Sequence, residues 1–255
     1  MVVCDGREGF ADLAPYDRVI VTASSDSVPV AWFEQVEPNG LLEVPLRFST
    51  TGAQAIPLLR KTRAGFRSAA LIAGGFMPLR AAGDDTAAVL KRPTLVASDA
   101  TGESGIPIHE LCGEAVKTLS PRAKRRLLSI SLGEGRRNSL GLRANSGALT
   151  LFLSLAVPAR HLVTTGPGFG IGVITRDGAS LALIETSFAR RKSLVSSLCT
   201  FGREDAAELL LRYVREWDRR GRPAESNLAI SVTYDDRRRP RLRYRWPGLD
   251  KVARL

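Results

Sequence analysis

Residues 16–46 read YDRVIVTASSDSVPVAWFEQVEPNGLLEVPL, and this stretch decides the fold of the first part of the chain. Its opening residues, 16–22, are rich in β-branched and apolar side chains, as in a strand buried on both faces of a parallel sheet. Residues 27–36 predict a helix, with Pro29 near its start, where a missing N–H costs nothing. Residues 41–46 predict a second strand. A strand, a helix and a strand in this order predict a right-handed parallel crossover.

The strand pattern continues beyond this crossover. Two further strands and one strand-like segment are expected at residues 54–61, 66–72 and 76–79. Residues 81–86 are small and polar, which is typical of a boundary. We therefore expect two domains, an α/β domain at residues 1–82 and an appended α+β domain at residues 87–255.

The second segment mixes helices and strands. We expect helices at residues 108–119, 121–130 and 203–220, and strands at residues 93–98, 169–175, 179–186, 227–234 and 241–246. Asp177-Gly178 between two strands is a strong hairpin signal. The last two strands predict an antiparallel pair in which arginines alternate with apolar residues. Arg241, Arg243 and Arg245 would face solvent, with Leu242, Tyr244 and Trp246 inward.

Composition and charge restrict the classes of protein. The chain has 255 residues, 44% of them hydrophobic and 25% charged, which is ordinary for a globular protein. It has no apolar run of membrane length and no secretion signal, so we expect a cytoplasmic protein. Three cysteines and two histidines show no metal-ligand spacing, and we expect no metal site.

The net charge of +11 is unevenly distributed. Residues 1–85 carry 8 basic and 10 acidic side chains, a net charge of −2, whereas residues 86–255 carry 29 and 16, a net charge of +13. The excess has two interpretations. It is a solvated arginine-rich surface, or it binds an anionic partner such as an acidic peptide or a nucleic acid.

The segment Cys4-Asp5-Gly6-Arg7-Glu8-Gly9 is the first candidate site. An acid beside a glycine can accept a hydrogen bond from an amino group while the glycine lets a flat ring approach the backbone. The same residues are also consistent with a simple turn.

The residues that follow carry a family resemblance. Asp5-Gly6-Arg7-Glu8-Gly9-Phe10, Ala14 to Ala23, Val28-Pro29, Phe33 to Val36 and Pro38 to Pro45 closely resemble, in order and spacing, protein-L-isoaspartate O-methyltransferases. Gly75-Phe76-Met77-Pro78-Leu79 looks like the terminal strand of that family. The resemblance covers about residues 1–80.

The resemblance implies a fold, a cofactor and site residues. The implied fold is a partial S-adenosylmethionine-dependent methyltransferase sheet, Rossmann-like, and the implied cofactor is S-adenosyl-L-methionine. Asp5 and Gly6 would line the adenine end of the cofactor pocket, and Thr22 and Ala23 would lie at the carboxyl end of the first strand, where ligands bind in such sheets. The implied reaction methylates isoaspartyl carboxylates, which are already nucleophiles, so it needs alignment more than a general base. We therefore name no catalytic residue.

The chain also departs from that family. In that family, the equivalent of Asp5 is preceded by the first strand, the glycine-rich loop and the acid that binds the ribose. We therefore expect this chain to be the C-terminal part of a methyltransferase. It would be truncated, or a separate N-terminal half or a second copy of the chain would complete it. The glycine-rich stretch from Gly166 to Gly172 predicts a loop entering a hairpin rather than a cofactor loop. An incomplete sheet leaves an unpaired strand edge.

The appended segment resembles the extension of methyltransferases associated with the maturation of ribosomally made peptides. That resemblance implies a protein or precursor-peptide substrate, with the basic surface holding an acidic leader. The alternative is a non-catalytic peptide-binding module. Nucleic acid is the less favoured partner, because the arginine-rich residues 234–246 also predict a plain hairpin.

Overall fold

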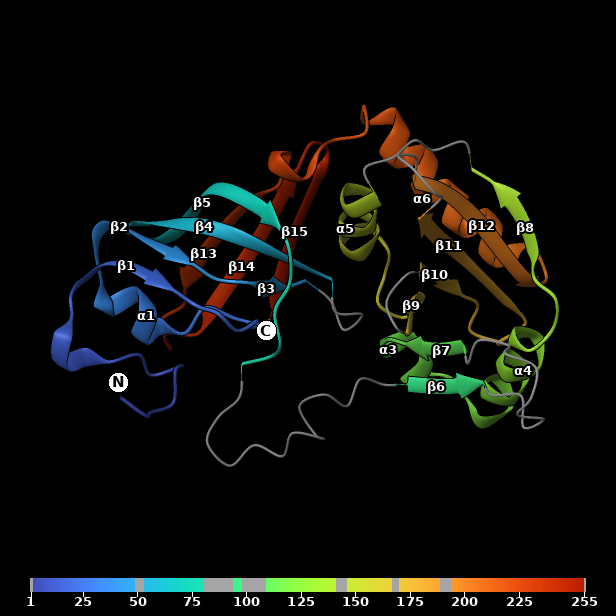
Figure 1. Ribbon diagram of the computed structural model, residues 1–255, viewed down its shortest axis with the longest axis horizontal. Helices are drawn as coiled ribbons and strands as arrows, with labels where there is room; N and C mark the ends of the chain where they lie inside the picture. Colours follow the sequence, from blue (N-terminus) through green and yellow to red (C-terminus); the bar gives the residue numbers. More distant parts are fainter. Residues whose placement is uncertain are drawn as a thin grey trace. The chain divides into compact units, whose positions relative to one another are not determined.

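The computed structural model describes residues 2–48, 53–79, 94–97, 109–140, 146–166, 170–188 and 194–254. These residues form two compact units, each built on its own sheet (Figure 1). The described residues of 2–79 and 223–254 make the first unit, and those of 94–222 make the second.

The first unit is a mixed sheet with one helix from the predicted crossover. The strands follow the spatial order β1-β2-β4-β5-β13-β14-β15, with β3 paired to β4. Their bounds are β1 Tyr16–Ile20, β2 Val36–Glu43, β3 Leu46–Arg47, β4 Gln54–Thr62, β5 Gly65–Ala73, β13 Ala229–Tyr234, β14 Pro240–Trp246 and β15 Leu249–Arg254. The strands β1 and β2 pair in parallel, and all other pairs in this sheet are antiparallel.

The predicted strand–helix–strand crossover is confirmed, with shifted boundaries. The helix α1, Val30–Gln35, begins after Pro29, and β2 already begins at Val36, five residues earlier than predicted. Val36 pairs with Tyr16 of β1, so the chain enters the strand at this residue in place of another helical turn. The protein is therefore an α/β fold at this point, as the sequence predicts.

One face of this sheet carries the core of the unit. The Phe33 ring of α1 lies edge-on to Phe66 of β5, with 5.6 Å between centroids, and 5.1 Å from Tyr234 of β13. Nearby, Phe48 packs edge-on against Tyr244 at 5.0 Å. Each central strand contributes buried side chains to this face: Leu42, Leu59, Phe66, Val232, Leu242 and Tyr244. The opposite face bears exposed arginines and aliphatic side chains.

The structure corrects the expected domain boundary. Residues 223–254 were expected in the appended domain, but they belong to the first unit, where β13 pairs with β5 through Ser231 and Arg67. The predicted antiparallel pair β13–β14 is confirmed, with the expected alternation of buried and exposed residues in β14. Local alternation predicts a strand but not its partner, and this partner lies more than 150 residues away.

The second unit is an antiparallel sheet covered by helices. Its strand order is β6-β7-β9-β10-β11-β12-β8. Its strands are β6 Thr94–Ala97, β7 His109–Cys112, β8 Arg136–Ser139, β9 Leu162–Gly166, β10 Gly170–Ile174, β11 Ser180–Phe188 and β12 Leu194–Gly202. Its helices are α3 Glu114–Lys117, α4 Pro121–Ser131, α5 Ser146–Ala156 and α6 Asp205–Arg219.

Helices pack on both faces of this second sheet. Leu181, Leu183 and Cys199 point to a core that also contains Ala115, Leu119 and Leu127 of the α3–α4 region. Ser180 points to the other face, where its hydroxyl accepts a hydrogen bond of 3.0 Å from the Ala206 N–H at the start of α6. The appended segment is thus α+β, as predicted.

Most expected elements of this unit are present, and one is wrong. The helix α6 and the hairpin β10–β11 around Asp177-Gly178 are confirmed, as is α4 with Ser120 as its cap. The predicted helix at 108–119 is instead β7 followed by the short α3, because β7 pairs with both β6 and β9. No helix in the described ranges has the length and apolar character needed to cross a membrane.

Candidate functional site

The segment around Asp5 forms a compact turn. The Glu8 N–H donates to the Asp5 carbonyl at 3.0 Å, and the Gly9 N–H donates to the Gly6 carbonyl at 3.3 Å. Gly9 has a φ of +65°, and a Cβ built on it would lie 2.1 Å from Oε1 of Gln35. The backbone of this turn therefore requires glycine at position 9.

Two side chains of α1 hold this turn in place. The Trp32 indole N–H donates to the Gly6 carbonyl at 2.7 Å. Gln35 binds the turn twice, because its Nε2 donates to the Glu8 carbonyl at 2.8 Å and its Oε1 accepts from the Phe10 N–H at 2.8 Å. Trp32 and Gln35 are not among the residues predicted from the sequence to position the site, although their three-residue spacing on one short helix was the available signal.

Asp5 is the ionised acceptor of the turn. The Arg7 backbone N–H donates to Oδ1 at 3.0 Å, and the Arg7 Nη2 donates to Oδ2 at 2.7 Å. The side-chain hydrogen bonds from Arg7, followed by the backbone one, lower the pKa of Asp5. A lowered folded-state pKa means that this interaction stabilises the fold above the unfolded pKa of about 4 and is lost as the pH falls through the folded value.

The backbone of Gly6 is exposed, and the space around it would accommodate a side chain. A Cβ built on it would lie 3.6 Å from Cδ1 of Leu79, an ordinary contact. The Gly6 main chain is thus free of side-chain cover on its exposed side, while its carbonyl is fixed by Trp32. Such a site allows a flat ring to approach the backbone closely.

Thr22 and Ala23 directly follow β1, after the Val21 N–H donates to the Glu43 carbonyl at 2.9 Å. Next along the chain, Ser24 donates to the Met77 carbonyl and accepts from the Leu79 N–H, both at 2.7 Å. The segment 77–79 therefore adjoins Gly6, through Leu79, and Ser24, the residue that follows Ala23. This arrangement brings the Asp5–Gly6 turn and the end of β1 to one side of the unit; the assignment of Asp5, Gly6, Thr22 and Ala23 to a cofactor stays a prediction.

The remaining candidate groups show ordinary structural roles. Cys112 and Cys199 are buried, and burial together with Glu185 raises the pKa of the Cys199 thiol to about 12. Cys4 is exposed, and its thiol donates to the Gly9 carbonyl at 3.6 Å. Nδ1 of His161 lies 3.0 Å from the Ile174 carbonyl. Across the described ranges, no group of three or more His, Cys, Asp or Glu side chains is placed to hold a metal ion.

The glycine-rich stretch from Gly166 to Gly172 falls in the second unit. Gly166 ends β9 and Gly170 begins β10, and these strands pair antiparallel. Residues 167–169 lie outside the described residues. The stretch thus leads into the β10–β11 hairpin, as predicted.

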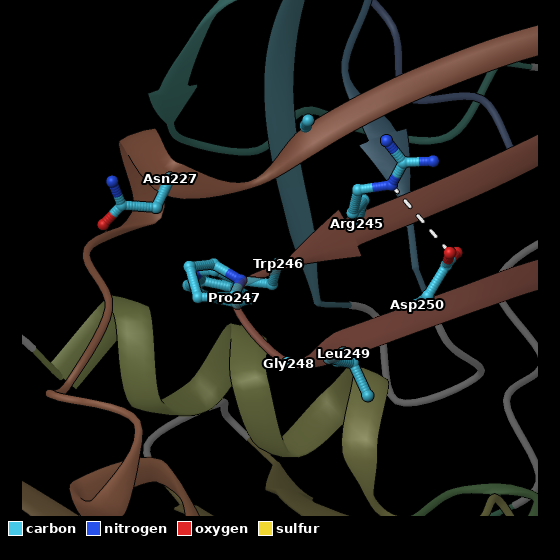
Figure 2. A pocket seen from close by; sticks show the side chains of 8 residues that line it. Asn227, Arg245, Trp246, Pro247, Gly248, Leu249 and Asp250 are labelled. Carbon is cyan, nitrogen blue, oxygen red and sulfur yellow. Dashed lines mark ion pairs between the residues drawn. The ribbon is translucent and has the colours of Figure 1, made fainter.

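A hollow in the first unit lies elsewhere in its sheet, around the β14–β15 turn (Figure 2). Its lining residues are Asn227, Ala229, Arg245, Trp246, Pro247, Gly248, Leu249 and Asp250. None of the four predicted cofactor residues lines this hollow. Arg245 and Asp250 come from neighbouring strands, with 3.9 Å between Nε and Oδ2.

We expect the Gln35→Met variant to loosen the Asp5–Phe10 turn. Methionine has a similar volume but cannot make the two amide hydrogen bonds, so exchange of the Phe10 amide hydrogen should accelerate about tenfold. Gln54→Met is the matched control, because the Gln54 amide makes the same pair of bonds to the backbone of Phe76. Hydrogen exchange should show Phe10 released only by the first variant and Phe76 only by the second; equal protection of Phe10 in both would contradict the clamp.

The comparisons with known proteins concern the first part of the chain. Residues 1–82 match the family model of protein-L-isoaspartate(D-aspartate) O-methyltransferase. A protein-L-isoaspartate O-methyltransferase of Parvibaculum lavamentivorans is 37% identical over 78 residues, which cover 30% of this chain and 35% of the relative. One of Ignicoccus hospitalis is 34% identical over 79 residues, covering 31% of this chain and 37% of the relative.

A solved structure titled protein-L-isoaspartate O-methyltransferase covers 94% of this chain and 58% of its own, at 17% identity and a TM-score of 0.35. The assignment therefore rests on the sequence match. The chain spans about a third of the length of the curated relatives it matches. Its residues 1–82 are thus similar in sequence to part of the protein-L-isoaspartate(D-aspartate) O-methyltransferase family.

Proposed function

We propose that the chain acts in S-adenosylmethionine-dependent O-methylation of isoaspartyl or aspartyl carboxylates in a protein or precursor peptide. The observation that carries this proposal is the family match of residues 1–82. The turn at Asp5–Gly6 and the segment after β1 support it, because Gly6 and Ser24, the residue after Thr22–Ala23, both adjoin the segment 77–79.

The residues at this side of the unit fit the adenine end of the cofactor. Asp5 is an ionised acceptor for an amino group, and the exposed Gly6 backbone offers a surface without a side chain. Trp32 and Gln35 fix the turn, so that little conformational freedom would be lost on binding. When bound, S-adenosylmethionine supplies an electrophilic methyl group.

The proposed methyl transfer requires few catalytic groups from this chain. A carboxylate is ionised at neutral pH and attacks without a general base, so the protein's role is to align the acceptor with the methyl donor and to exclude water. No titratable side chain of this region is assigned a proton transfer. Substrate orientation would decide the rate.

Further strands have a place to join this unit. In the described sheet, β1 forms one end of the strand order and pairs with β2 alone. The remaining parts of a methyltransferase sheet would add at that edge, from preceding sequence, a second copy or another chain. We also propose a cytoplasmic location, in which the exposed thiol of Cys4 would stay reduced.

One observation favours a second function, a non-catalytic peptide-binding module. Both carboxylate oxygens of Asp5 already accept hydrogen bonds from Arg7. An adenine amino group would have to share this acceptor with a charged guanidinium. If that competition prevents cofactor binding, the second unit becomes the functional part, in a system for peptide maturation.

Calorimetric titration with S-adenosylhomocysteine separates the two functions. We expect the full chain to bind it in the micromolar range, with affinity lowered about tenfold or more in Asp5→Asn, because the carboxylate acceptor is replaced by an amide. Asp12→Asn is the matched control, since Asp12 is an exposed acid in the 3-10 helix just after the turn. Absence of binding by a well-folded chain, or an equal loss in both variants, would contradict the proposed cofactor site.

A further inference from the structure

Four arginines lie in one row across the first sheet. Strand register places one residue from each of six neighbouring strands directly opposite the next, all on the face away from the core. From β1 to β14 the row reads Arg18, Leu41, Arg60, Arg67, Ser231 and Arg243. At about 4.8 Å between strands, this row is about 24 Å long. Arg241 and Arg245 flank its end on β14.

The arginines of this row are exposed and largely unneutralised within the described residues. Arg243 pairs with Asp250 of β15. Arg60 donates to the Asn39 carbonyl at 3.1 Å, and no ion pair is formed by Arg18 or Arg67 with any described residue. The row itself contains no acid, and Glu43, which follows Leu41 on the same face of β2, forms no ion pair with any described residue. The charge of the row is therefore directed mainly to solvent.

The arrangement is unfavourable for the isolated sheet. Arg60 and Arg67 stand directly opposite each other on adjacent strands, and like charges in that position repel. On a sheet face whose only role is solubility, we would expect acidic residues opposite the arginines on neighbouring strands, as Asp250 pairs with Arg243. An anionic ligand across the row would turn this repulsion into attraction.

The side chains between the arginines indicate what kind of anion fits. Leu41 lies within the row. Leu58, Ile72 and Val252 lie at neighbouring positions on the same face of the sheet. Ile72 and Val252 are exposed large hydrophobic residues. From β2 to β15 no aromatic residue points to this face, and the hydroxyl of Tyr16 on β1 is bound to the Phe10 carbonyl. The strands from β2 to β15 therefore lack the stacking groups that bind single-stranded nucleic acids.

We propose that this row, named here the arginine row, binds an acidic polypeptide segment that carries aliphatic side chains between its carboxylates. Guanidinium groups bind carboxylates in paired hydrogen bonds, and the aliphatic residues between them offer apolar contact. The hollow of Figure 2 borders the row at Arg245 and Asp250 and extends the surface beyond β14. The proposal is independent of methyl transfer, because the arginine row lies on the strands and not at the Asp5–Gly6 turn.

Binding is measured by fluorescence anisotropy, with the full chain and no cofactor. The probe is a labelled peptide rich in Asp and Glu with leucine at every third position, and the competitor probe is an oligothymidylate of equal charge. We expect salt-sensitive binding of the peptide, and weaker binding of the oligothymidylate. The double variant Arg60→Gln/Arg67→Gln should weaken peptide binding about tenfold.

The matched control is Arg122→Gln/Arg125→Gln, which removes the same charge from two exposed positions of α4 in the second unit. It should change the affinity less than about twofold. Arg18→Gln, at the other end of the row, provides a second variant on a different strand and should also weaken binding. Equal losses in the row and control variants would overturn the proposal, as would tighter binding of the oligothymidylate, which would assign the surface to nucleic acid.

Discussion

A chain that ends at Arg222 is expected to lose the folded first unit and to keep the second. The strands β13 and β14 supply Ile230, Val232, Leu242, Tyr244 and Trp246 to the core, and each of these side chains is at most 2% exposed. At about 2 kcal/mol for each buried side chain, their removal costs about 10 kcal/mol, comparable to the total stability of a domain. Hydrogen exchange should show loss of protection in β4 and β5 and retained protection in β10 and β11.

Two point variants of the full chain provide the control for this truncation. Tyr244→Ala empties a core position beside Phe48 and should lower the free energy of unfolding by about 3 kcal/mol or more. Val252→Ala, on the exposed face of β15, should lower it by less than about 1 kcal/mol, since Val252 is 54% exposed. If the truncated chain kept β4 and β5 protected, residues 1–82 would form a core without β13 and β14, which would contradict this prediction.

Gly65→Ala is expected to disrupt the junction between β5 and β13. Gly65 has a φ of +136°, which side-chain-bearing residues rarely adopt, and a Cβ there would lie 2.0 Å from the Val232 carbonyl oxygen. That oxygen belongs to the backbone of a paired strand and cannot move aside without breaking the ladder. We expect a loss of about 3–5 kcal/mol in the free energy of unfolding, measured by chemical denaturation.

Gly221→Ala separates backbone strain from close approach. Gly221 has a φ of +76°, but nothing lies within 4 Å of a Cβ built there. Only the strain of the left-handed conformation remains, so the expected loss is about 1–2 kcal/mol. If Gly65→Ala and Gly221→Ala lowered the free energy of unfolding by similar amounts, the close approach of β13 would not be the reason for glycine at position 65.

Several features could be read from local sequence. The run from Tyr16 to Leu46 predicts its crossover because strand and helix periodicities are local properties of consecutive side chains. The alternation in residues 241–246 predicts which side chains are buried, and this holds in β14. The motifs around Asp5–Gly6 and Pro38–Pro45 indicate the family that the comparisons support.

Other features depended on contacts between distant segments. Residues 227–246 were expected with the basic second segment, yet they extend the sheet of the first unit. The net charge of residues 1–85 is slightly negative, but the fold aligns Arg18, Arg60 and Arg67 of this segment with Arg243 on one face. Likewise, the clamp of the Asp5 turn by Trp32 and Gln35 required a short helix to end beside it.

The amino-acid sequence was thus sufficient for most elements, for the inward and outward faces of the clearest strands, and for the family resemblance of residues 1–82. The pairing of β5 with β13, the arginine row and the clamped turn emerged only in the folded chain. The physical reason is that a periodicity of two is encoded by neighbouring residues, whereas the choice and register of a strand's partner depend on complementary packing between segments far apart in sequence.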